Sequence, residues 1–517
     1  MHPAFFPDAA PPSRSCAPAR SCAPTRSCAT RRWTVVTVAL CAALAACSAT
    51  RTGLAIVDGG GDPTEAGADG GPGPRDGGDV DAGDVDGGPS DGGAEEGGVA
   101  DGGASDAGDV DAGCGPVSEA CNGRDDDCDG LVDEGFSFAD DPANCGACGR
   151  ACASGEMCAA SACVAPNDVV QVAAGSDFSC ARLAGGRVYC WGANAVGQLG
   201  RGSAAASNTA VQVMGLEDAV DLDAGTVHAC AVRATGRVVC WGDGGNGRLG
   251  DGFKMDRLAP VETAVTDAVR VATGGEHTCA LRVGGLLSCW GRNDRGQLGV
   301  AGGDLAVATE VTLPLRVVDV SGGGKHSCAI LEDGSGLCWG ENGARQLGDG
   351  SMTDRGAPTV VTTLAAARDV ASGGDFNCAR VGGARVQVAC WGGNAGGQLG
   401  DGSTDNRSAA AVVAGLDGAL QLTAGDAHAC ARFDDGALQC WGKNSGGCLG
   451  DGTSSDRPTP VSVVARGRAV HVSAGAEHTC AARGDGTALC WGTGADGRLG
   501  NDDTVDSLVP VAVVGLP

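Results

Sequence analysis

One short segment of the chain places carboxylates at the spacing that a hard cation requires. Asp125, Asp127 and Asp129 alternate, a glycine follows them, and Asp133 completes the set. In an EF-hand loop, carboxylates at alternating positions converge on one calcium ion, and glycine allows the tight turn. The twelfth position, where a bidentate glutamate is usual, is Phe136. We therefore expect these four aspartates to bind calcium weakly, in the range typical of extracellular sites.

The alternative to a calcium site is a solvated acidic turn that serves only a structural role. Cys121 and Cys128 would hold such a turn in place. The run from Cys121 to Gly130 is similar to a Cys-Asn-Gly-x-Asp-Asp-Asp-Cys-Asp-Gly motif of bacterial surface proteins that are described as metal-binding. That resemblance covers this segment alone, and it implies a calcium site.

A second chemically distinctive position lies near the N-terminus. Arg31 and Arg32 precede a short apolar run that ends in Leu-Ala-Ala-Cys at residues 44–47. A basic stretch, an apolar run too short to span a bilayer and small residues before the cut are typical of a secretory signal. The last four residues resemble the bacterial lipobox, which implies that Cys47 receives lipid and becomes the mature N-terminus. Ordinary cleavage nearby is the alternative, and residues 1–30 suggest a mis-set translation start.

Composition excludes several classes of function. The 517 residues include 36 basic and 64 acidic ones, a net charge of −28, whereas nucleic-acid binding needs clustered lysine and arginine. The chain also has 28 cysteines, which are hard to keep reduced in a cytosol, so disulfides and export are expected. A DNA-binding protein and a soluble cytosolic enzyme are both disfavoured.

Composition also divides the chain into four parts. The signal peptide spans residues 1–47, and residues 48–113 are a Gly/Asp/Ala tether that has too little to bury and should be disordered. Residues 114–166 form a cysteine-rich module whose eight cysteines indicate a disulfide framework. Its pairing cannot be deduced from the spacing, and zinc binding through Cys145 and Cys148 is the alternative. Repeats fill residues 167–517.

The repeats share the sequence Cys-Trp-Gly, which occurs seven times at spacings of 49 to 52 residues. The tryptophans are Trp191, Trp241, Trp290, Trp339, Trp391, Trp441 and Trp491. A period near 50 with short alternating strands indicates a propeller. With four strands in each unit, the sequence predicts an all-β fold, a seven-bladed β-propeller.

Each unit also contains a cysteine pair whose members are ten residues apart, or twelve in the fifth unit. Even separations suit directly opposed residues of a hairpin with an odd-length loop, and a three-residue loop favours glycine at its last position. Six units have that glycine, and the fifth has Arg385 there. Cys448 is left over, as a free thiol or an intermolecular link. The predicted disulfides are Cys180–Cys190, Cys230–Cys240, Cys279–Cys289, Cys328–Cys338, Cys378–Cys390, Cys430–Cys440 and Cys480–Cys490.

This pattern resembles the regulator of chromosome condensation repeat family, most specifically in Trp-Gly-x-Asn-x-x-Gly-Gln-Leu-Gly from Trp191 to Gly200. The resemblance covers the whole repeat region. It implies a seven-bladed propeller that serves as a binding platform, with a protein partner whose identity the sequence does not give. The family's plant photoreceptor uses tryptophans two residues before the repeat histidine. Thr226 and Gly275 hold those positions here, so light sensing is not supported.

No residue departs from the repeat background as a catalytic nucleophile, so we expect no enzyme, no catalytic residue and no cofactor besides calcium. The recurrent histidines are better interpreted as hydrogen-bonding residues of the framework; they are His228, His277, His326, His428 and His478. The chain is expected to be a lipid-anchored protein of the cell envelope, in the outer membrane or on the cell surface. Its alternatives are a structural envelope or coat component and an exported enzyme, such as a lyase or hydrolase, that uses the propeller face.

Overall fold

The structure is a computed structural model that describes residues 121, 138, 141–159, 161–383, 385–464 and 467–517. The predicted signal peptide and tether, Cys47 and the expected calcium ligands Asp125, Asp127, Asp129 and Asp133 lie outside these residues, and the boundaries between the four parts stay predictions. Within the described part of the chain, none of the helices has the length and apolar composition needed to cross a bilayer.

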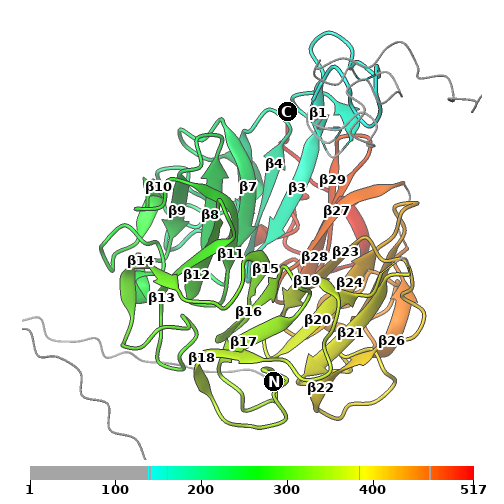
Figure 1. Cartoon of the computed structure of the whole chain (residues 1–517). Coiled ribbons are helices and arrows are strands. Elements are labelled where there is room, and N and C mark those ends of the chain that lie inside the picture. Colours follow the sequence, from blue (N-terminus) through cyan, green and yellow to red (C-terminus); the bar gives the residue numbers. More distant parts are fainter. Residues whose placement is uncertain (1–120, 122–137, 139–140, 160, 384, 465–466) are drawn as a thin grey trace, which may run out of the picture. The chain divides into compact units, whose positions relative to one another are not determined.

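Seven antiparallel sheets of four strands surround a central axis, as Figure 1 shows. Each sheet consists of consecutive strands, here designated A to D from the axis outward, and forms one blade. The prediction of an all-β, seven-bladed propeller is therefore confirmed.

The strand bounds follow the sequence period. Blades 1 to 3 contain β3 (Val169–Ala174), β4 (Phe178–Leu183), β5 (Val188–Gly192), β6 (Ser207–Gln212); β7 (Ala219–Ala224), β8 (His228–Arg233), β9 (Val238–Gly242), β10 (Arg257–Glu262); β11 (Ala268–Thr273), β12 (His277–Arg282), β13 (Leu286–Gly291) and β14 (Leu305–Val311). Blades 4 and 5 contain β15 (Val317–Gly322), β16 (His326–Leu331), β17 (Gly336–Gly340), β18 (Arg355–Val360); β19 (Ala367–Ser372), β20 (Phe376–Val381), β21 (Gln387–Gly392) and β22 (Arg407–Val412). Blades 6 and 7 contain β23 (Gln421–Ala424), β24 (His428–Arg432), β25 (Leu438–Gly442), β26 (Arg457–Ser462); β27 (Ala469–Ala474), β28 (His478–Arg483), β29 (Ala488–Gly492) and β30 (Ser507–Ala512).

Strands B and C of each blade form the disulfide-linked hairpin that the cysteine spacing predicts. In blade 1, Cys180 lies directly opposite Cys190, with 4.0 Å between their Cα atoms. The loop of residues 184–186 ends in Gly186, whose φ of +87° is costly for any residue with a Cβ. Blade 5 pairs Val381 with Gln387, so its loop is two residues longer and the cysteines still face each other. The structure contains the same seven disulfides that the sequence predicts.

The hydrophobic core lies between neighbouring blades. All seven repeat tryptophans are fully buried, and Trp241 of blade 2 packs against Phe178 and Val188 of blade 1. Its indole Nε1 donates a hydrogen bond to the carbonyl oxygen of Gln198, which also belongs to blade 1, at 2.9 Å. Each tryptophan thus contributes both apolar burial and one directed bond to the blade before it.

The ring closes by the same contacts. Trp191 of blade 1 packs against Leu499 of blade 7 and donates to the carbonyl oxygen of Arg498 at 2.9 Å. Among the described strands, no sheet combines the two ends of the propeller, because blade 1 consists of β3–β6 and blade 7 of β27–β30.

The described part of the cysteine-rich module is a small disulfide framework. It contains the hairpin of β1 (Met157–Ala159) and β2 (Ala162–Val164). Three bonds hold it, namely Cys121–Cys148, Cys145–Cys158 and Cys152–Cys163. Cys114 and Cys128 lie outside the described residues.

Candidate functional site

The repeat histidines lie at the blade interfaces. Each is buried, begins strand B, and meets a polar side chain of the next blade through Nε2. The pairs are His228 with Thr278 (2.9 Å), His277 with Ser327 (2.7 Å), His326 with Asn377 (2.9 Å), His428 with Thr479 (2.9 Å) and His478 with Ser179 (2.7 Å). Blades 1 and 5 have Phe178 and Phe376 instead, and there the next blade presents Ala229 and Ala429. At this position, each interface is therefore polar in both blades or apolar in both blades.

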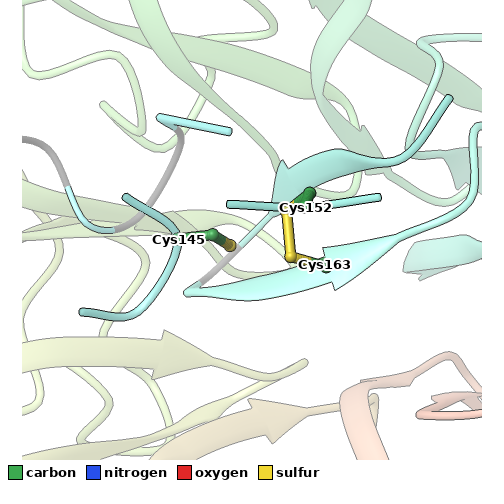
Figure 2. A group of neighbouring side chains, drawn as sticks. All are labelled: Cys145, Cys152 and Cys163. Atoms are coloured by element: carbon green, nitrogen blue, oxygen red, sulfur yellow. A yellow bond between two sulfur atoms is a disulfide. The ribbon is translucent and has the colours of Figure 1, made fainter. Parts of the chain in front are cut away.

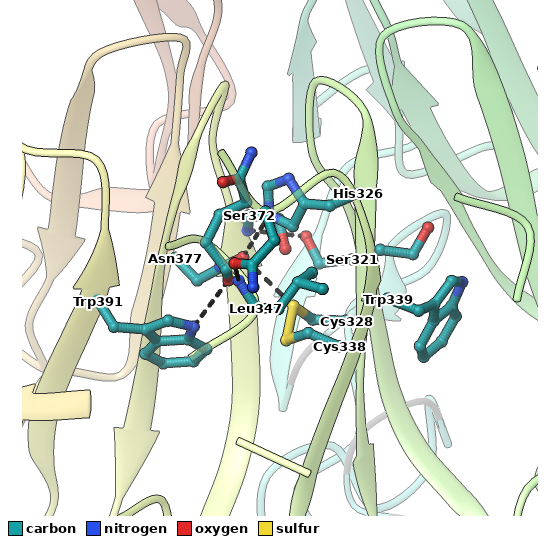
Figure 3. The surroundings of a disulfide bond; sticks show 12 residues. Ser321, His326, Cys328, Cys338, Trp339, Leu347, Ser372, Asn377 and Trp391 are labelled. Atoms are coloured by element: carbon teal, nitrogen blue, oxygen red, sulfur yellow. Dashed lines mark hydrogen bonds between the residues drawn. A yellow bond between two sulfur atoms is a disulfide. The ribbon is translucent and has the colours of Figure 1, made fainter. Parts of the chain in front are cut away.

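The hydrogen bonds also fix which ring nitrogen carries the proton. Asn377 donates from Nδ2 to the carbonyl oxygen of Gln346 at 2.7 Å, so its Oδ1 accepts from His326 Nε2. Trp391 Nε1 donates to the same carbonyl at 3.0 Å. Figure 3 shows this chain of bonds beside the Cys328–Cys338 disulfide.

Burial keeps these histidines neutral. It lowers the pKa of His277 and His478 to about 3 and that of His428 to about 4. Nδ1 is left as the basic nitrogen, and in His228, His277, His326 and His478 it meets no hydrogen-bond partner among the described residues. A buried nitrogen without solvent contact cannot exchange a proton with a substrate. This agrees with the interpretation of these histidines as framework residues.

The A strands line a polar cavity of about 210 Å³ on the propeller axis. Carboxylates of the A strands join neighbouring blades: Asp223, which lines the cavity, accepts from the backbone N–H of Thr273 at 2.7 Å, and Asp319 accepts from that of Val370 at 2.9 Å. Burial raises the pKa of both aspartates to about 6. Asp319 also pairs with Arg270. The A strands belong to separate sheets, and these side chains join them in place of a backbone hydrogen-bond ladder. We therefore assign the cavity a structural role.

The cysteine-rich module brings the sulfur atoms of Cys145, Cys152 and Cys163 within 4.8 Å of one another, and Figure 2 shows the group. Zinc binds thiolates, whereas these sulfurs are engaged in Cys145–Cys158 and Cys152–Cys163. The alternative of a zinc site through Cys145 and Cys148 therefore does not fit, because Cys148 is bonded to Cys121.

The C–D loops present exposed apolar side chains on a rigid frame. In blade 6, Asn444 Oδ1 accepts from the Leu449 N–H at 3.0 Å, and Arg457 pairs with Asp451 at 2.7 Å. In the corresponding loop of blade 2, Phe253 and Met255 are both 57% exposed. Sequence reasoning missed these two residues, although they are the large apolar side chains between a Gly-Asp-Gly-like turn and the Asp-Arg that closes the loop.

Cys448 is the remaining distinctive residue of the repeats. It is unpaired and 2% exposed, and its thiol donates to the carbonyl oxygen of Lys443 at 3.1 Å. Burial raises the pKa of this thiol to about 12. The structure therefore favours a buried free thiol over an intermolecular link.

Comparisons with known proteins agree with this architecture. The sequence model of the RCC1-like domain matches residues 143–409, and models of the regulator of chromosome condensation (RCC1) repeat match residues 435–482, 420–448 and 469–498. Among curated proteins, none is significantly similar in sequence to this chain.

Two solved structures have the same fold. Human WBSCR16 is 22% identical, with a TM-score of 0.54, and the match covers 60% of this chain and 86% of that one. Yeast RCC1 (Prp20), crystallised bound to Kap60, is 20% identical with a TM-score of 0.57, and the match covers 66% and 84%. Because the family model spans more than half of the sequence, this chain belongs to the RCC1-like domain family.

Proposed function

We propose that this protein is an exported, lipid-anchored surface protein that presents its propeller as a platform for binding another protein. One observation carries the proposal. The repeat histidines join neighbouring blades and the disulfides join strands within each blade, whereas the C–D loops keep a fixed frame and vary in the side chains that they expose. A rigid scaffold with variable loops is the usual arrangement of a binding surface.

Related folds support the class of function without naming the partner. The yeast protein Prp20 was crystallised bound to Kap60, and another structure of it is described together with its binding to Gsp1p and histones. At 20% identity these proteins share the fold with this chain, and their partners are not transferred to it.

Export is supported by the disulfides, because the ten found among the described residues suit an oxidising compartment. In this proposal Cys47 carries the lipid and the acidic tether of residues 48–113 extends away from the membrane. Asp125, Asp127, Asp129 and Asp133 hold calcium in the module between tether and propeller.

The platform is tested by cross-linking the full chain to its neighbours on the surface of the producing cell. We expect one protein to be captured repeatedly, and the Phe253→Ser, Met255→Ser double variant to lose most of this capture. Val412→Ser is the matched control, because Val412 is 53% exposed on β22, away from the C–D loops. A surface on which no protein is specifically captured would contradict the platform role and favour a purely structural one.

A further inference from the structure

Two arginines of the propeller bind back onto their own turns. Short 3₁₀ helices lie in the C–D loops of three blades: η1 (Gly245–Gly247), η2 (Ser445–Gly447) and η3 (Ala495–Gly497). Arg248 follows η1 and Arg498 follows η3. Their Nε atoms donate to the carbonyl oxygens of Gly245 at 3.0 Å and Ala495 at 2.9 Å.

Both guanidinium groups also reach the next blade. Arg248 lies 3.9 Å from a carboxylate oxygen of Glu276, and Arg498 lies 2.7 Å from one of Asp177. Arg498 further donates to the carbonyl oxygen of Ser176 at 3.0 Å. The arginine site thus has a turn carbonyl on one blade and an acid, with a carbonyl beside it, on the following blade.

The third turn has the same backbone but no arginine. Cys448 follows η2 with φ −61° and ψ −14°, against −62° and −14° at Arg248 and −63° and −14° at Arg498. The next blade supplies Glu477 at the position of Glu276 and Asp177. The cysteine side chain is too short to occupy the volume that an arginine fills.

A cavity of about 100 Å³ lies where the guanidinium would be. Its lining includes Ser445, Ala476 and Glu477, which correspond to the residues that hold Arg498 from its turn and from the next blade. Within the described residues, Glu477 forms no ion pair and its side chain accepts no hydrogen bond. All the acceptors of an arginine site are present, and the donor is missing.

The surroundings of this cavity are negative. Asp426 lines it, and the pKa of Asp426 is raised by burial and by the charges of Asp375, Glu477 and Asp177. Lys443 also lines the cavity and offsets part of this charge. A metal ion is a poor occupant, because in the described part of the chain Cys448, Glu477 and Asp426 do not bring their ligand atoms within 4.8 Å of one another.

We propose that this cavity, here called the Cys448 pocket, binds a guanidinium group supplied by an arginine side chain of a protein partner. The proposal rests on the platform function. Guanidinium is favoured over ammonium because its planar fork can donate to the turn carbonyl and to the carboxylate at once, as Arg498 does.

The first experiment uses ethylguanidinium as the probe and alkylation of Cys448 as the readout, with peptide mapping of the folded full chain. We expect saturable, several-fold slower alkylation with ethylguanidinium and no such effect with tetramethylammonium. Glu477→Gln should lose most of the protection. Measurable alkylation of Cys448 that ethylguanidinium does not slow would overturn the proposal and leave a water-filled cavity.

A matched control comes from another unit. Gln198→Cys places a second thiol at the same repeat position of blade 1, where the next blade has Val227 in place of the acid. Both thiols are read in one sample, and only Cys448 should be protected. Equal protection of the two would mean a general effect of the cation, and it would overturn the assignment to the Cys448 pocket.

The second experiment supplies the guanidinium within the chain. Cys448→Arg should raise the thermal midpoint and reduce capture of the surface partner at least tenfold, whereas Gln198→Arg should leave capture unchanged. Undiminished capture by Cys448→Arg would keep the platform function and overturn the arginine contact. Absence of any partner, with ethylguanidinium still protecting Cys448, would instead contradict the platform function and remove the partner from the proposal.

Discussion

His326 Nε2 donates a hydrogen bond to Asn377 Oδ1 at 2.9 Å, across the interface of blades 4 and 5. The amide passes the connection on to the carbonyl oxygen of Gln346 and so ties three segments of two blades. Four other interfaces use serine or threonine in place of the asparagine. Opposite a histidine, the position therefore requires a group that accepts one hydrogen bond and donates another.

Replacing Asn377 tests this requirement. Asn377→Leu should lower the free energy of unfolding by about 1–3 kcal/mol, because His326 and the Gln346 carbonyl lose a buried partner. Asn377→Thr is the control, since Thr278 and Thr479 have the same role in other blades, and it should cost less. Urea unfolding of the two variants measures the difference. Equal losses would indicate that packing, and not the hydrogen bonds, governs this position.

The free energy of unfolding should decrease as the pH is lowered below about 6.5. Burial lowers the folded-state pKa of His277 and His478 to about 3 and that of His428 to about 4, so between these values and the unfolded pKa of about 6.5 the unfolded chain binds more protons. Each histidine then lowers the free energy of unfolding by up to about 1.4 kcal/mol per pH unit. Asp223 and Asp319, whose pKa is raised to about 6, have the opposite effect, because between pH 6 and 4 the folded chain binds more protons at these two residues. The three histidines outnumber them, so the net effect is a loss of stability.

Denaturation midpoints at pH 7.5 and pH 5 check this prediction, and His277→Gln should flatten the dependence. A midpoint that rises on acidification would show that the axial carboxylates outweigh the histidines.

The hairpin disulfides should each contribute somewhat less than about 3 kcal/mol, because each closes a loop of only about ten residues. Non-reducing peptide mapping should find Cys230 linked to Cys240 and Cys480 linked to Cys490. The double replacement Cys230→Ala, Cys240→Ala should remain folded with a lower thermal midpoint. Links between different units would contradict the assignment of the blades.

The module should bind calcium weakly, with a dissociation constant of about 10⁻⁴–10⁻³ M, because the twelfth-position glutamate is missing. Calorimetric titration of the oxidised full chain should give a saturating heat that Asp127→Ala removes. Equal heats for the two proteins would leave the solvated acidic turn as the better interpretation of residues 125–133.

Lipid attachment should depend on Cys47. Because several acyl chains anchor a protein stably where one is marginal, the wild type should fractionate with membranes and incorporate labelled palmitate. Cys47→Ala should do neither and keep its folded domains, as circular dichroism would show. An unlabelled wild type, together with a variant that still fractionates with the outer membrane, would refute the lipid anchor.

The blade architecture was accessible to sequence reasoning because it is local. Each hairpin is identified by two cysteines ten residues apart and by a loop glycine such as Gly186. The same pattern recurs in the seven units of the sequence, with a longer loop in the fifth. Pairing in the module was not accessible, since eight cysteines allow 105 pairings and no period selects among them.

The relation of Cys448 to Glu477 was also beyond sequence reasoning, although both residues are visible in the sequence. It depends on a turn of one blade reaching an acid on the next, which only the arrangement of the blades in space reveals. The sequence signal was present as a cysteine where two other units have arginine.

Because every blade is built from one uninterrupted stretch of chain, the propeller can assemble in the order in which the chain is made. A segment of about fifty residues that is synthesised first contains all four strands and both cysteines of its blade, so the blade can form without a distant segment. The last event is the meeting of Trp191 with Arg498. The described blades share no strand at any interface, but only at this seam does the chain not pass directly from one blade to its neighbour, so under a pulling force we expect the ring to open there first.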